Sequence, residues 1–227
     1  GREGIVASVD SKRRNLPPPT PFSLGDLQRE AYQHFHLSPR TTLSAAERLY
    51  LSALISYPRT SSQRLPPSID IREILRGLGR IGGYANLSRG LLSKPSLRPR
   101  QGEKDDPAHP AIHPTGNRPE RLNRVEGRLF DLICRRFMAT LGDAAVRLDV
   151  DAEVEVDGRR FHLRGSRLVE PGWTLFYAPF VREKGVNLPA LREGQILRLV
   201  RVEAVRRFTK PPPRLNPGSL LKLMEDE

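Results

Sequence analysis

The sequence is poor in cysteine and aromatic residues, and it has no long apolar run. Its single cysteine, Cys134, has no internal disulfide partner and lies among apolar residues, so we expect a packed core thiol and a reducing, cytoplasmic location. No apolar run approaches the roughly 18 residues that span a bilayer, and no charged-then-apolar leader opens the chain. Aromatic residues make up 6% of the chain, which argues against extensive base-stacking platforms. These features argue against a secreted disulfide-rich protein and a membrane protein.

Acidic residues are scarce relative to basic ones. The chain has 26 Asp and Glu against 38 Lys and Arg, which gives a formal net charge of +12. The basic residues are spread along the chain, for example over Lys12–Arg14, Arg118–Arg128 and Arg201–Arg207. Because such a spread suits a groove that follows a phosphate backbone, we expect a nucleic acid partner and no membrane.

The spacing of metal-ligating residues does not indicate zinc, because the five histidines and one cysteine show no ligand spacing. His109 and His113 are four residues apart, but the prolines around them oppose the helix that would align them as a metal pair.

The Tyr57-Pro58-Arg59 motif is the most informative stretch. Proline disfavours an α conformation at Tyr57, and in extended chain residues i and i+2 project to the same side. The Tyr57 hydroxyl and the Arg59 guanidinium are therefore expected to face one phosphate. Since a phenol is a poor nucleophile without help, the permanently charged arginine would assist an attack on a phosphodiester. The alternative is a turn that exposes a cation.

Further motifs accompany this one in a characteristic order. They are the segments Pro17–Phe22, Asp26–Ala31, Leu49-Tyr50, Ile55–Thr60, Ala108–Gly116, Gly172-Trp173, Thr209–Arg214 and Leu220–Glu225. On these motifs the chain resembles the type IA DNA topoisomerases over essentially its whole length. The Tyr-Pro-Arg-Thr-Ser-Ser run is most similar to the archaeal members.

The resemblance implies roles for individual residues. Tyr57 matches the nucleophile that becomes joined to the 5′ phosphate of a cut single strand. Arg59 matches the arginine that assists cleavage, and His109 matches a histidine that hydrogen-bonds near the scissile phosphate. Ser61 stands where many members have aspartate, and we expect no catalytic role for it. Nucleic-acid contacts are expected from three further residues, Thr60, Arg64 and His113.

The resemblance also implies partners. In this family a Toprim domain supplies an acidic general acid/base and the carboxylates for Mg²⁺, and only about sixteen residues precede the proline-rich segment here. We therefore expect a gate fragment that binds no metal itself and is inactive alone in relaxation. Its expected partners are single-stranded or negatively supercoiled DNA and the Toprim portion of the same parent protein. We expect a monomer located with the nucleoid.

The run Asp149-Val150-Asp151-Ala152-Glu153 imitates the acidic signature of the Toprim domain. It lies within a strict alternation of apolar and charged residues from Val146 to Val156. This pattern predicts a strand whose acidic residues form one solvated face.

Helical periodicity dominates the first part of the chain. Ser23 and Asp26 predict a capping box and a helix through Phe35, ended by Pro39. A second helix is expected to begin at Thr42 to Ser44, with Leu49 and Tyr50 turned inward. A weak helix over Ile69–Leu78 precedes sequence interpreted as loop up to residue 108. Asn123 and Glu126 predict the cap of a long helix that Gly142 ends.

From Val146 the apolar residues recur at every second position instead of at helical spacing. A strand to Val156, an Asp157-Gly158 hairpin turn and a return strand are predicted, with more strand at Trp173–Phe180 and Ile196–Phe208. Ile5–Val9 is expected to join this sheet. The fold class is therefore α+β. A winged-helix-like tyrosine domain at 17–145 is inserted into a β-rich arch domain at 1–16 and 146–227, with hinges expected near Asn15–Pro19 and Gly142–Val146.

Two other functions remain open at this point. A non-catalytic winged-helix DNA-binding module would use Tyr57 only to contact phosphate. A basic RNA-binding or ribosomal protein would account for the charge but not for the combination of Tyr57, Arg59 and His109.

Overall fold

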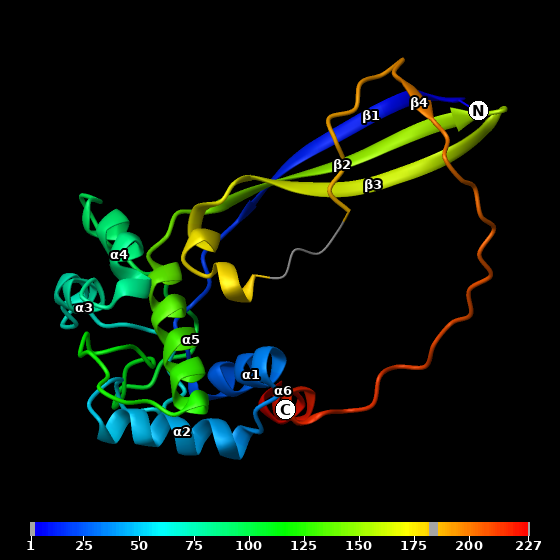
Figure 1. Cartoon of the computed structure of the whole chain (residues 1–227). Coiled ribbons are helices and arrows are strands. Elements are labelled where there is room, and N and C mark those ends of the chain that lie inside the picture. The colour runs from blue at the N-terminus through cyan, green and yellow to red at the C-terminus, as the bar shows by residue number, and fades with distance from the viewer. Residues whose placement is uncertain (1–2, 182–185, 227) are drawn as a thin grey trace. The chain divides into compact units, whose positions relative to one another are not determined.

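The computed structural model describes residues 3–181 and 186–226, which form two compact units (Figure 1). The sheet unit contains residues 3–16, 144–172 and 186–213, and the helical unit contains residues 17–143, 173–181 and 214–226. The boundaries at 16/17 and 143/144 fall inside the two expected hinge regions. The chain also passes between the units at 172/173, between residues 181 and 186, and at 213/214. The division drawn from the sequence therefore needs correction, because residues 173–181 and 214–226 belong to the helical unit.

The sheet unit is built on antiparallel strands in the order β3-β2-β1-β4. Asp157 and Gly158 both have positive φ, 50° and 74°, which is the geometry of a two-residue hairpin turn that matches strand twist. The predicted hairpin and the predicted pairing of the opening strand are confirmed. The strands are β1 Glu3–Leu16, β2 Ala145–Val156, β3 Arg159–Glu170 and β4 Ile196–Arg198.

The acidic row of β2 lies on a face where basic side chains pair with it. Asp149 contacts Arg14 at 3.1 Å, and Asp151 contacts Arg164 at 2.9 Å. Alternate residues Val154 and Val156 are buried instead. Within the described ranges, no cluster of three or more His, Cys, Asp and Glu side chains could hold a metal ion. The solvated-face interpretation of this strand therefore fits the structure.

One predicted strand is wrong and another is shorter than predicted. Residues Trp173–Phe180 form two 3₁₀ turns, η2 Gly172–Leu175 and η3 Ala178–Phe180, and only Ile196–Arg198 of the second stretch is strand. The reason lies in the spacing of the aromatic residues. These aromatic residues recur at helical intervals, at positions 173, 176, 177 and 180. They pack on the core of the helical unit, and Tyr177 is buried.

The helical unit packs around a long central helix, α5 (Figure 1). Its residues Leu129, Ile133 and Phe137 are fully buried, and so is Cys134, as expected. In the described part of the chain, no helix combines the length and apolar character required to cross a membrane. The helices are α1 Leu24–Phe35, α2 Pro39–Leu51, α3 Ile71–Leu78, η1 Gly82–Tyr84, α4 Ala85–Leu92, α5 Arg124–Thr140 and α6 Pro217–Asp226.

The helix ends carry the capping contacts that the sequence predicts, with one exception at Pro39. Both predicted capping boxes, Ser23 with Asp26 and Asn123 with Glu126, are present. Pro39 does not end α1, which stops at a left-handed His36. Instead Pro39 is the first residue of α2 and follows the N-cap Ser38, because proline fits the first helical turn. Helix α4 lies between residues 79 and 108, so the prediction of a loop there is wrong.

A buried ion cluster ties the 3₁₀ segment to α1 and α5. Glu30 accepts hydrogen bonds from Arg136, at 2.5 Å, and from the Tyr177 hydroxyl. Burial alone would raise the pKa of Glu30, but His34, Arg136 and Tyr177 together outweigh it and lower that pKa to about 2. The Arg136 guanidinium also lies over the Phe22 ring, 4.5 Å from its centroid. Glu30 is therefore ionised in the folded state at all but the lowest pH.

Candidate active site around Tyr57

Tyr57 lies on an irregular segment that follows α2 and is anchored on both sides. Ile55 is buried and forms an isolated bridge with Pro114, and Thr60 is buried, whereas Tyr57 is half-buried. No wing hairpin forms in the described residues here, because the extended segments pair only through isolated bridges. The buried neighbours fix the backbone and leave the phenol partly accessible.

The chain folds back along α2 after this helix ends. Ala53 has φ 54°, in the left-handed region, and its carbonyl accepts hydrogen bonds from Thr115 at 2.7 Å and Asn117 at 2.8 Å. Tyr57 then packs edge-on against Tyr50, with ring centroids 5.4 Å apart. Tyr50 is 42% exposed, so the expectation that it turns into the core is wrong.

The loop that carries His109 meets the tyrosine. The rings of Tyr57 and His109 have centroids 4.8 Å apart. The Thr60 hydroxyl donates to the His109 carbonyl at 3.1 Å, and the Asp106 carboxylate accepts from the His109 amide at 3.3 Å. Two segments about fifty residues apart in the sequence therefore place a phenol and an imidazole side by side.

Arg59 has a different partner. Its Nε and Nη2 both donate to Oε1 of Glu47 on α2, at 2.9 and 2.5 Å. The guanidinium is thus engaged by a carboxylate in this structure. The sequence analysis did not assign Glu47 or Tyr50 to this site, although their spacing of three residues on a predicted helix places them on one face.

Of the three expected nucleic-acid contacts, Thr60 and Arg64 have side-chain hydrogen-bond partners within the protein. The Thr60 hydroxyl accepts from the Ser62 amide at 3.0 Å, and Arg64 donates to the Gly102 carbonyl at 3.1 Å and to Asp105 at 3.2 Å. His113 Nδ1 is buried without a hydrogen-bond partner among the described residues, and burial lowers the pKa of His113 to about 4. At neutral pH His113 is therefore a neutral imidazole, not a cation.

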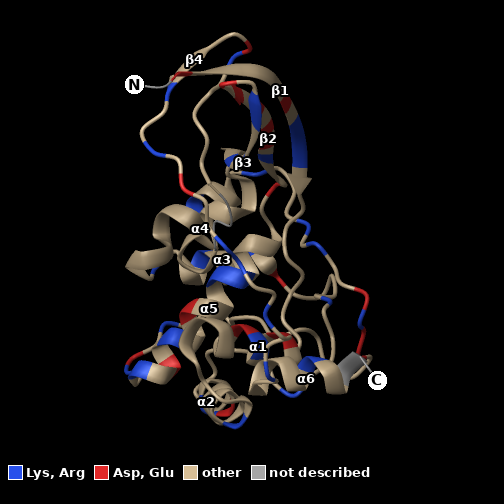
Figure 2. Ribbon diagram, turned by 90° about the vertical axis from the view of Figure 1, so that its right-hand side faces the viewer, with Lys and Arg blue, Asp and Glu red and all other residues tan. Residues whose placement is uncertain are grey.

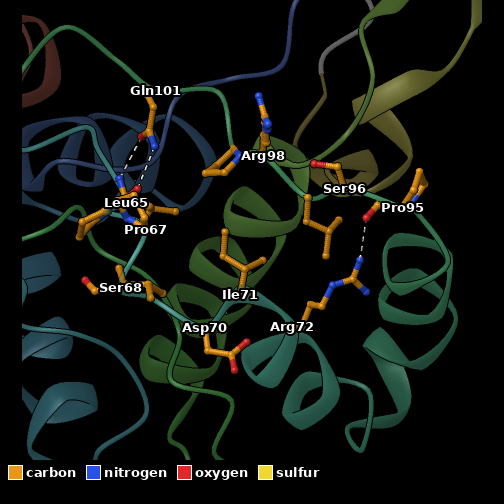
Figure 3. Close-up of a pocket in the computed structure, with 14 residues that line it drawn as sticks. Leu65, Pro67, Ser68, Asp70, Ile71, Arg72, Pro95, Ser96, Arg98 and Gln101 are labelled. Atoms are coloured by element: carbon orange, nitrogen blue, oxygen red, sulfur yellow. Dashed lines mark hydrogen bonds between the residues drawn. The ribbon is translucent and has the colours of Figure 1, made fainter.

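A groove adjoins the site. One part, of about 570 Å³, is lined by Arg64, Asp106 and His109, and it shares Leu65–Ile69 and Gln101 with a second part of about 860 Å³. Figure 3 shows this second part, where the Gln101 side chain bonds the backbone of Leu65 at 2.9 and 2.8 Å. Arg72 donates to the carbonyls of Leu92 and Lys94 and, at 3.3 Å, to that of Pro95, which lines the same part of the groove.

Basic residues recur in both units (Figure 2). A family model described as DNA topoisomerase matches residues 1–227. The chain belongs to the DNA topoisomerase family. This topoisomerase chain is 42% identical to DNA topoisomerase 1 of Pyrococcus horikoshii, over 97% of its own length and 32% of the relative. It is 43% identical to DNA topoisomerase 1 of Aeropyrum pernix, over 97% of its own length and 33% of the relative.

The topoisomerase chain thus spans about a third of the length of these curated relatives. Among solved structures, the full-length topoisomerase I from Thermotoga maritima is similar, with a TM-score of 0.76 and 26% identity over 99% of this chain and 38% of that chain. The α+β fold and the family resemblance drawn from the sequence are confirmed.

Proposed function

We propose that this chain is the strand-passage gate of a type IA DNA topoisomerase, in which Tyr57 cuts single-stranded DNA and remains joined to its 5′ phosphate. The observation that carries the proposal is the contact between the half-buried Tyr57 ring and the His109 ring, with an arginine two residues further along the chain. Family membership supports DNA as the substrate.

The proposed chemistry is a transesterification. The Tyr57 oxygen forms a bond to phosphorus, the bond from phosphorus to the 3′ oxygen breaks, and the phenolic proton is lost while the 3′ oxygen gains one. Arg59 would neutralise charge on the phosphoryl oxygens, and His109 would donate a hydrogen bond to the same phosphate. Because one phosphate ester replaces another, religation needs no ATP.

The general acid/base and Mg²⁺ are proposed to come from a Toprim portion of the parent protein. Mg²⁺ would supply positive charge that positions the phosphates of the strand. The side chains described here fit the nucleophile and the phosphate contacts, and the acidic row of β2 does not supply a metal site, since Asp149 and Asp151 pair with arginines.

The two-unit organisation supports a gate. We propose that the helical unit carries the cut 5′ end while a second strand passes, and that the joints lie at two of the places where the chain passes between the units, 16/17 and 143/144. Proline at positions 17 to 19 makes the first joint semi-rigid, which favours swinging over local melting.

The test uses the full-length protein with a labelled single-stranded oligonucleotide. Tyr57→Phe should abolish the covalent protein–DNA adduct and leave the dissociation constant for the strand close to wild type, because only one hydroxyl is removed. Equal adduct yields from both proteins would refute the assignment of the nucleophile. Salt-sensitive binding with no adduct from the wild type would instead favour a non-catalytic DNA-binding module.

A further inference from the structure

One face of α2 contacts the first and last residues of the Tyr57-Pro58-Arg59 motif. Glu47 accepts both hydrogen bonds from Arg59, and Tyr50, one turn later, packs against the Tyr57 ring. This arrangement follows from the reversal at Ala53, which sends the motif back along the helix. Helix α2 thus sets the positions of both side chains.

We propose that Glu47 is a positioning residue that holds the Arg59 guanidinium in the empty protein and releases it to the phosphodiester of an incoming strand. This inference rests on the proposed function. A carboxylate and a phosphodiester each present acceptor oxygens that suit the arginine fork, so the two anions compete for the same guanidinium. The motif therefore exchanges one anionic partner for another when the strand binds.

Exposure makes this exchange feasible. The Arg59 side chain is 54% exposed and the Glu47 side chain 38%, so water screens their attraction. Ion pairs of this kind stabilise by an amount equivalent to about a twofold to fivefold change in an equilibrium constant. In contrast, the side chains of Arg136 and Glu30 are only 11% and 25% exposed, so this pair is largely buried. Arg59 is held firmly enough to be ordered and weakly enough to be displaced.

The decisive experiment is a double-mutant cycle in the full-length protein with Glu47→Gln, Arg59→Ala and the double variant. Dissociation constants for a single-stranded oligonucleotide are measured by fluorescence anisotropy in a Tyr57→Phe background, so that cleavage does not interfere. Glutamine keeps the size of the side chain and removes its charge. We expect Glu47→Gln to tighten binding about twofold to fivefold. In the Arg59→Ala background the same change should have no effect.

Two controls distinguish this role from a general effect of charge and from loss of the fold. Glu120→Gln removes the same charge from an exposed loop of the helical unit and should leave binding unchanged. Melting temperatures of all variants report whether the fold is intact.

Each other outcome has a clear meaning. Equal tightening with and without Arg59 would show a general effect of net charge and overturn the proposal. Weaker binding by Glu47→Gln in a folded protein would also overturn it. If the wild type forms an adduct at Tyr57 but Glu47→Gln changes nothing, only the role of Glu47 fails. Absence of any adduct would defeat the proposed function itself.

Discussion

Glu30→Gln is the perturbation whose size follows most directly from the structure. The pKa of Glu30 is lowered from its ordinary value of 4.5 to about 2 in the folded state, despite its burial, by His34, Arg136 and Tyr177. At about 1.4 kcal/mol per pKa unit, the ionised carboxylate stabilises the fold by about 3 kcal/mol. Because the folded pKa is the lower one, this stability is present above pH 4.5 and is lost as the pH falls towards 2.

The substitution also leaves Arg136 largely buried without its anion, a situation that costs about 3–5 kcal/mol in proteins. We therefore expect Glu30→Gln to lower the free energy of unfolding at pH 7 by about 3 kcal/mol. Between pH 5 and 2 its stability should vary less with pH than that of the wild type.

Urea unfolding of the 227-residue chain, followed by tryptophan fluorescence, suits this measurement. Trp173 is the single tryptophan of the chain, and its ring lies 6.3 Å from that of Tyr177, a member of the ion cluster. Glu120→Gln is the matched control, because it makes the same chemical change at an exposed site. Parallel stability curves for wild type and Glu30→Gln between pH 5 and 2 would refute the reasoning.

Three more predictions follow from single residues. Arg59→Ala should lower the rate of DNA cleavage about a hundredfold and change strand affinity much less. Cleavage is measured as adduct formation and affinity by anisotropy, both in the full-length protein. Equal losses of cleavage rate and affinity would contradict a role in the transition state. Ala53→Val should destabilise the protein in thermal melts, because a β-branched residue at φ 54° is strained, whereas Ala53→Gly should be neutral or stabilising. Cys134 should resist alkylation until the protein unfolds, because burial, reinforced by Asp131, holds its pKa well above the usual range; fast reaction with the native protein would exclude this packing.

Local signals in the sequence predicted much of the fold. The caps at Ser23 and Asn123 and the turn at Asp157-Gly158 depend on hydrogen bonds and dihedral angles within a few residues, so the sequence alone determines them. The segment Trp173–Phe180 was misassigned because a short apolar run fits a strand and a helical turn equally well until its tertiary partner is known. Its partner is the core of the helical unit, which no local pattern identifies.

The candidate site was less accessible to sequence reasoning. The pairing of Tyr57 with His109 was expected from the family resemblance alone, because two loops joined by long-range hydrogen bonds leave no periodic pattern. The contacts of Glu47 and Tyr50 depend on a left-handed alanine at position 53, a conformation that alanine adopts rarely. No local pattern in the sequence therefore predicts the strained residue that aligns the motif.

Two arginine–glutamate pairs of the helical unit show how burial decides whether a pair can be exchanged for another partner. Arg136 and Glu30 have the same charged groups as Arg59 and Glu47, but the first pair is largely buried and also bonded by Tyr177 and by the Thr20 carbonyl. Breaking this pair would leave an unpaired charge that water hydrates poorly, so we do not expect a ligand to displace either partner. Arg59 has water around it, and a phosphate that replaces Glu47 leaves a carboxylate that water can solvate. In the proposed function, the exposed pair is therefore the one suited to open when a DNA strand binds.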